Sequence, residues 1–176
     1  MTAGNRTNLR STLYSYLTGA NIPTLNQIFT SFPKRINFQL NSTAGQMSRS
    51  AVVIFIQGER ETRLAIGGAT NGWKRVDYTV VLQVFHHSLQ NLAENAMADF
   101  DTLIDNIKTT LRADHRFGDT TRNYVWQGAE PAIDTFYGEP VTSDNGATET
   151  WAEIRFDVTQ MIQAWERYGN VPIYRL

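Results

Sequence analysis

Few residues of this chain could act as catalytic bases or metal ligands. Histidine occurs three times, at His86, His87 and His115, and cysteine is absent. His86 and His87 are adjacent near the end of an expected strand, so they should be surface residues on opposite faces, poorly placed to share a metal ion. His115 follows an expected helix, where its imidazole would complement the helix dipole. We therefore expect no histidine to act as a base or ligand.

Acidic residues and glycines form two further patterns. Asp101 and Asp105 are one helical turn apart and Asp99 precedes them, but they fall on the polar face of an expected helix without a calcium-binding loop. The glycine-rich segment 67–72 joins two expected strands and lacks the Walker spacing and a following helix, so it is predicted to be a turn. We expect no enzyme, and no catalytic, cofactor-binding or metal-binding residue.

The composition is that of one globular domain. The chain has 176 residues, of which 41% are hydrophobic and 19% charged. The absence of cysteine excludes disulfides and suits a reducing compartment. No stretch approaches the roughly 20 apolar residues of a membrane span, and the first residues lack the apolar run of a signal peptide. We expect a single soluble domain over residues 1–176, without a membrane partner.

The net charge of −1 conceals an asymmetry along the chain. Before residue 76 there are nine basic and two acidic residues, a net +7, whereas the remainder has seven basic and fifteen acidic residues, a net −8. One interpretation is chance scatter over a solvated surface. The other is a bipolar subunit whose two parts attract copies of itself or different neighbours. A nucleic-acid-binding domain would instead show a net basic excess.

Hydrophobic periodicity predicts the elements of the first half. An apolar stripe predicts a helix over 8–18, and Pro23 begins a second short helical turn over 22–29. Residues 37–50 are expected to be a loop. Residues 51–56 form a strand, 57–59 a tight turn and 60–66 a returning strand, which together make a hairpin. The longest strand, 73–86, directs alternate residues to one face: Val76, Tyr78, Val80, Leu82 and Val84.

The second half begins with the clearest helix, over 90–113. A strand over 124–133 is interrupted by Pro131, and a polar loop over 138–148 leads to a last alternating strand around 152–158. Residues 163–176 resemble an extended arm. No strand–helix–strand repeat occurs, so we predict an α+β fold: a mostly antiparallel sheet with the long helix and one or two shorter ones packed on one face.

Several aromatic residues fall where an isolated domain would leave them exposed. Core packing explains any one of them, but as a set they fit buried subunit contacts, where Trp, Tyr and Arg concentrate. The thirteen arginines against three lysines agree with this interpretation. The expected subunit-interface residues are Trp73, Arg75, Trp151, Trp165, Tyr168 and Tyr174.

The element order resembles that of the tail terminator proteins of long-tailed bacteriophages, also called tail completion or head-to-tail joining proteins. The resemblance rests on the first helix, the segment IPTLNQIFTSFPKRI, the expected β-hairpin, the long strand, the acidic helix LAENAMADFDTLIDNIKTTL and the two closing strands. It implies a virion protein assembled in the host cytoplasm, forming a ring of six copies at the head-proximal end of the tail tube. Its partners would be the major tail tube protein and the neck or head-completion proteins.

DNA would pass through such a ring without specific binding. Because lysine and arginine attract phosphate, the channel should be faced by acidic or neutral segments. Two segments are candidates for this lumen-facing role: the loop with Glu139, Asp144 and Glu149 is one, and the expected hairpin turn near Glu59 and Glu61 is the other.

Two alternatives stay open. Within the structural class, the chain could be a neck adaptor, a head-closure ring or a tail tube subunit. In a different class, it could be a small monomeric binding or enzyme domain with a pocket near His115 and the loop 118–121.

Overall fold

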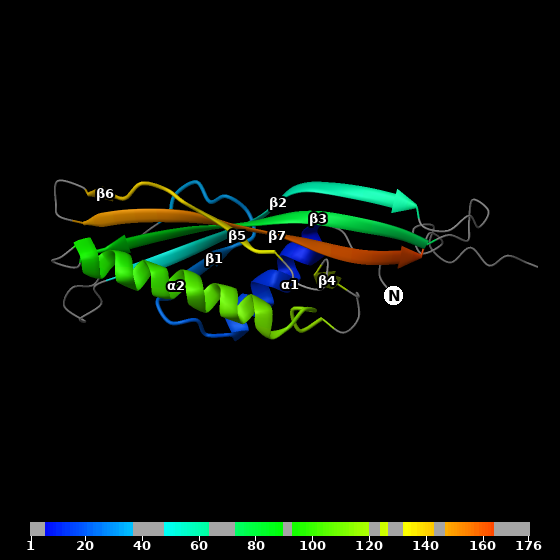
Figure 1. The fold of residues 1–176 in the computed structure, drawn as a ribbon, viewed down its shortest axis with the longest axis horizontal. Helices are drawn as coiled ribbons and strands as arrows, with labels where there is room; N and C mark the ends of the chain where they lie inside the picture. The colour runs from blue at the N-terminus through cyan, green and yellow to red at the C-terminus, as the bar shows by residue number, and fades with distance from the viewer. Residues whose placement is uncertain are drawn as a thin grey trace, which may run out of the picture.

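The computed structural model of the chain describes residues 6–36, 48–63, 73–89, 93–119, 124–126, 132–142 and 147–163. It confirms the predicted α+β class: a mostly antiparallel sheet with helices packed on one face (Figure 1). The helices are α1 (Arg6–Gly19) and α2 (Ala93–Ala113). The strands are β1 (Leu25–Phe29), β2 (Ser48–Arg63), β3 (Trp73–Ser88), β4 (Tyr124–Trp126), β5 (Asp134–Tyr137), β6 (Val141–Thr142) and β7 (Thr148–Gln163).

Three strands of 16 residues each, β2, β3 and β7, form the centre of the sheet. The strand order is β1-β2-β3-β7-β4, and β5 and β6 also pair with the outer edge of β7. Every pair is antiparallel except β1 with β2. The central strands run along the longest axis of the molecule (Figure 1).

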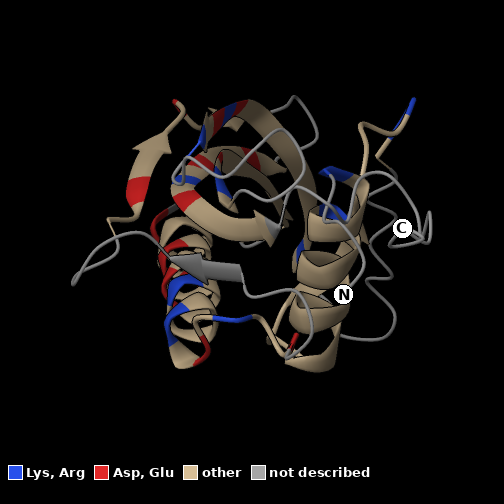
Figure 2. Cartoon of the chain, turned by 90° about the vertical axis from the view of Figure 1, so that its right-hand side faces the viewer, with Lys and Arg blue, Asp and Glu red and all other residues tan. Residues whose placement is uncertain are grey.

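The core lies between this sheet and the two helices. Register places Val52, Val84 and Ala152 side by side on the helix-facing side, and the next core row is Ile54, Leu82 and Ile154. The helices contribute apolar stripes at helical spacing, and all of these side chains are buried: Leu9, Leu13, Leu17, Phe100, Leu103, Ile104, Ile107 and Leu111. Helix α1 lies against β1 and β2, and α2 lies against β3 and β7, so the helices are side by side on the same face (Figure 2).

The predicted short helix at 22–29 is wrong. After α1 ends, Asn21 and Thr24 both have positive φ angles, of 47° and 65°, and turn the chain sharply. The residues that follow then pair in parallel with Ser50–Val53 as strand β1. Leu25 and Ile28 thereby reach the core, and this tertiary pairing overrides the local helical signal.

The predicted hairpin at 57–59 is also wrong. Strand β2 runs without a turn from Ser48 to Arg63, and a β-bulge lies between Ile56 and Gly58. A bulge adds one residue and reverses the alternation beyond it, so Glu59 falls on the side of Tyr78, which faces the helices. The hairpin is formed instead by β2 and β3. Its connection, including the predicted turn 67–72, lies outside the described residues.

The other expected elements agree in part. The strand over 73–86 and the helix over 90–113 are confirmed as β3 and α2, with β3 extending to Ser88 and α2 beginning at Ala93. Of the strand expected at 124–133, residues 124–126 form β4 and 127–131 lie outside the description. The expected loop 138–148 contains β6 and the start of β7, and the expected loop 37–50 ends in the first residues of β2. The arm beyond residue 163 lies outside the described residues.

Replacement of Leu103 by alanine tests the packing of α2. Leu103 is fully buried between α2 and the sheet, so Leu103→Ala should lower the free energy of unfolding by about 2 to 5 kcal/mol. Asp101→Ala, on the exposed side of the same helix, should change it by no more than about 0.5 kcal/mol. Chemical denaturation measures both values. Equal effects of the two substitutions would contradict this placement of α2.

Candidate assembly surface

The face of the sheet opposite the helices, called here the open face, carries exposed apolar side chains. Odd-numbered residues of β3 and β7 point to this side, as the pairing of Phe85 with Trp151 shows. Phe32 follows β1 and packs on Phe55 of this face, with ring centroids 5.2 Å apart. Four large apolar residues on the open face are 39% to 52% exposed: Trp73, Phe136, Trp151 and Met161.

Two pairs of oppositely charged residues lie on the open face. Arg75 lies 2.8 Å from Asp77, which also accepts a hydrogen bond from the Thr159 hydroxyl at 2.7 Å. Arg155 contacts Glu153 at 2.6 Å, and its guanidinium lies over the Phe136 ring, 4.9 Å from its centroid. The open face is therefore a mixture of apolar groups and locally neutralised charges.

Trp151 is held at the edge of the open face by Gly138, the residue after β5. The backbone N–H of Gly138 donates to the carbonyl oxygen of Trp151 at 2.9 Å. A Cβ atom on Gly138 would overlap the indole ring, so only glycine allows the ring to lie against this backbone.

The expected interface residues are placed as follows. Trp73 and Trp151 are exposed on the open face, and Arg75 is bonded to Asp77 on the same face. Trp165, Tyr168 and Tyr174 lie outside the described residues. The role of all six residues in subunit contacts stays a prediction.

The expected lumen-facing residues lie at opposite ends of the sheet. Glu59 pairs with Arg6 at 2.9 Å and Glu61 pairs with Lys74, both near the end of β2. Glu149 opens β7 beside His87, 3.3 Å from its Nδ1 atom, and Glu139 is exposed between β5 and β6. Asp144 lies outside the description. The two groups therefore cannot face the same short stretch of a channel.

The charge asymmetry along the sequence becomes an asymmetry across the sheet. We call described residues 6–63, with α1, β1 and β2, the basic flank; it carries seven basic and two acidic residues, a net +5. Described residues 93–163, with α2 and β4 to β7, form the acidic flank; it carries eleven acidic and four basic residues, a net −7. Figure 2 shows red residues along α2 and none on α1 itself.

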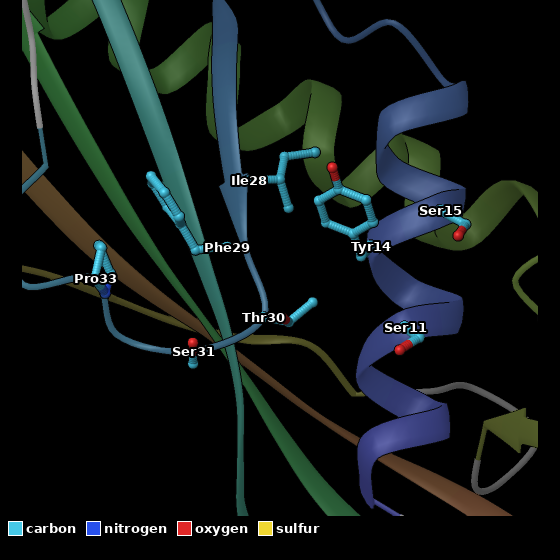
Figure 3. Close-up of a pocket in the computed structure, with 8 residues that line it drawn as sticks. All are labelled: Ser11, Tyr14, Ser15, Ile28, Phe29, Thr30, Ser31 and Pro33. Atoms are coloured by element: carbon cyan, nitrogen blue, oxygen red, sulfur yellow. The ribbon is translucent and has the colours of Figure 1, made fainter.

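The basic flank contains a groove between α1 and the end of β1, with a volume of about 490 Å³ (Figure 3). Its walls combine hydroxyl groups with apolar and aromatic side chains. At its margin, the Arg10 guanidinium donates to the carbonyl oxygen of Thr30 at 2.9 Å, which joins the helix to the chain leaving β1. The described lining residues are Ser11, Tyr14, Ser15, Ile28, Phe29, Thr30, Ser31 and Pro33.

A second hollow, of about 640 Å³, lies between the C-terminal ends of α1 and α2. It contains Gly118 from the loop suggested for a monomeric enzyme, but His115 does not line it. Tyr16 lines the hollow, and its hydroxyl donates to the Thr110 carbonyl at 2.7 Å, while burial raises its pKa. Asp114 caps the turn by accepting the backbone N–H groups of Arg116 and Gly118, and these bonds lower its pKa. The described lining residues contain no carboxylate or imidazole.

The expectation that His86 is a surface residue is wrong. Strand β3 continues past it to Ser88, so His86 is 1% exposed on the helix-facing side. Its Nδ1 lies 2.8 Å from the Ser50 hydroxyl, and its ring stacks on Phe100, with centroids 5.7 Å apart. Burial lowers the pKa of His86, so the imidazole stays neutral down to a lower pH than that of an exposed histidine. Because Ser50 is buried as well, the pair has no access to a substrate from solvent.

Two absences hold within the described parts of the chain. No group of three or more metal-ligating side chains there is placed to hold an ion. No helix in those parts is long and apolar enough to cross a membrane.

Comparison with known proteins adds no assignment. No protein-family model matches the sequence, and a search of curated proteins returns no significant match.

Substitution of Gly138 tests the seating of Trp151. Gly138→Ala should displace the indole ring and destabilise the protein by about 1 to 3 kcal/mol, because the new methyl group overlaps the ring. Gly58→Ala is the matched control, since a Cβ atom there meets no atom within 4 Å. Thermal unfolding compares the two variants. A Gly138→Ala protein as stable as the Gly58→Ala protein would contradict the contact.

The pH dependence of stability tests the burial of His86. The pKa of His86 in the folded chain lies below the ordinary value of 6.5. Between these two values, the unfolded chain is protonated at this residue and the folded chain is not. The free energy of unfolding should fall as the pH drops from 6.5 and level off below the folded pKa. His86→Gln should lose this component of the slope, as measured by denaturation across pH. If His86→Gln shows the same pH dependence as the unmodified chain, the proposed burial of a neutral His86 is contradicted.

Proposed function

We propose that this chain is a structural subunit that assembles head to tail into a closed ring. The observation that carries the proposal is the opposite charge of the basic and acidic flanks. A ring is built from two different surfaces, each meeting its counterpart on the next copy. Flanks of net +5 and −7 on opposite sides of one sheet satisfy that requirement, and they disfavour contacts between like flanks.

Exposed apolar side chains support association as well as charge. On the acidic flank, Phe136, Tyr137 and Val141 are 51% to 61% exposed along the β5–β6 edge of the sheet. Partly exposed aromatic residues of this kind are enriched in subunit contacts. Charge would then set the orientation of neighbouring copies, and apolar burial would supply affinity.

The resemblance to tail terminators gives such a ring a place and a role. We propose that it caps the head-proximal end of a phage tail tube and joins it to the neck, as a virion protein without enzymatic activity. Its partners would be the major tail tube protein and the neck or head-completion proteins. DNA would pass through the lumen, with one of the two ends of the sheet that carry the expected lumen-facing residues turned toward it. The end with Glu139 and Glu149 is the more acidic of the two, because Glu59 and Glu61 are paired with Arg6 and Lys74, and it would limit phosphate attraction better.

Native mass spectrometry tests the assembly. The unmodified chain should appear as one closed oligomer, with six copies as the expected number. Asp101→Lys combined with Asp105→Lys places basic groups on the exposed face of α2 and should weaken association by about tenfold or more. Arg112→Glu, on the same helix, makes the acidic flank more acidic and should not weaken it. A solitary chain at micromolar concentration would contradict the proposal.

A further inference from the structure

We propose that the groove between α1 and β1 receives the β5–β6 edge of the next copy in the ring. This inference deepens the proposed head-to-tail assembly and rests on it. It assigns one contact: the side chains of Phe136 and Val141, which lie on the open-face side of the β5–β6 edge, enter the groove on the basic flank of the neighbouring subunit.

The groove has the size and chemistry to take aromatic side chains. Its volume of about 490 Å³ lies within the range of about 300 to 1,000 Å³ seen for cavities that bury small organic ligands. Ile28, Phe29 and Pro33 supply apolar surface, and the hydroxyl groups around them can satisfy polar groups of an incoming chain. Its described lining residues carry no charge, so an apolar side chain would displace water without stranding an ion.

The groove also borders an edge of the sheet. Strand β1 is the last strand on this side, and the described residues contain no strand beyond it. Figure 3 shows Tyr14, on α1, directed toward Ile28 of β1. Tyr14 is 41% exposed, so the wall that it forms is open to an incoming chain.

The β5–β6 edge has the complementary form. It lies on the opposite edge of the sheet, because β5 and β6 both pair with the outer side of β7. The strands are short, four and two residues, and leave Val141 61% and Phe136 52% exposed on the same side. Tyr137 points to the other side, where its ring lies against Phe100 of α2, with centroids 6.1 Å apart. Strands β2, β3 and β7 separate this edge from β1, so it cannot reach the groove of the same chain.

Local charge favours this pairing over contacts of the edge with itself. The β5–β6 edge is flanked by Asp134, Glu139 and Glu149. The groove is flanked by Arg10, whose guanidinium already joins α1 to Thr30, and by exposed Lys34 and Arg35, which follow the lining residue Pro33. Two copies of the acidic edge would repel each other, whereas the basic surroundings of the groove attract it. A second copy is therefore the occupant that the charges select.

Disulfide trapping in the full-length chain tests this contact, because the chain has no cysteine of its own. The test variant combines Ser11→Cys in the groove with Val141→Cys on the edge. A disulfide forms only when the two Cα atoms come within about 4.4 to 6.8 Å. After mild oxidation, the variant should shift from a single-chain band to a ladder of covalent multimers on a denaturing gel. The matched control, Ser11→Cys with Thr102→Cys, places the second thiol on the exposed face of α2 and should stay a single chain.

Native mass spectrometry of the same samples distinguishes failure of this contact from failure of the closed ring. A closed ring without the Ser11–Val141 ladder, or with equal ladders in test and control, overturns this contact and leaves the ring intact. A ladder in open filaments supports the contact and overturns the closed ring. A solitary chain without a ladder overturns both. If Ser11→Cys instead cross-links with Tyr174→Cys, the groove takes the C-terminal segment, and the contact proposed here is wrong.

Discussion

One face of the long sheet is apolar and must be covered, and the placement of both helices follows from this requirement. Strands β2, β3 and β7 align rows such as Ile54, Leu82 and Ile154, and this surface must be removed from water. Helices α1 and α2 cover it side by side, each with one buried stripe. Because both helices are used on this face, the opposite face retains exposed residues, among them Trp73 and Met161.

The same arrangement places the early and the late parts of the sequence on different sides of the sheet. The strand order β1-β2-β3-β7 follows the order of the chain, so the early, basic residues lie on one side of the sheet and the late, acidic residues on the other. Each flank also has its own shape. The basic flank is hollowed between α1 and β1, and the acidic flank ends in short strands with exposed apolar side chains. Shape and charge together provide the two different surfaces that a head-to-tail assembly requires.

Sequence patterns predicted the long elements, in which buried and exposed positions recur at a regular spacing. The alternation from Val76 to Val84 and the apolar stripe of α2 are long enough to identify a strand and a helix without tertiary information. The predictions for two short segments were wrong. Residues Leu25–Phe29 form a strand because they pair with β2, and Gly58 lies at a bulge, not in a turn. His86 was misplaced because β3 continues two residues past it. The groove could not be predicted, because it arises where α1 packs beside β1, and neither segment alone shows it.

Electron microscopy of the purified, unmodified chain tests whether its copies assemble head to tail. We expect closed rings in which the basic flank of every copy, with α1 and β1, faces the acidic flank of the next, with α2 and β5 to β7. Single copies, or two-fold pairs in which like flanks meet, would contradict it.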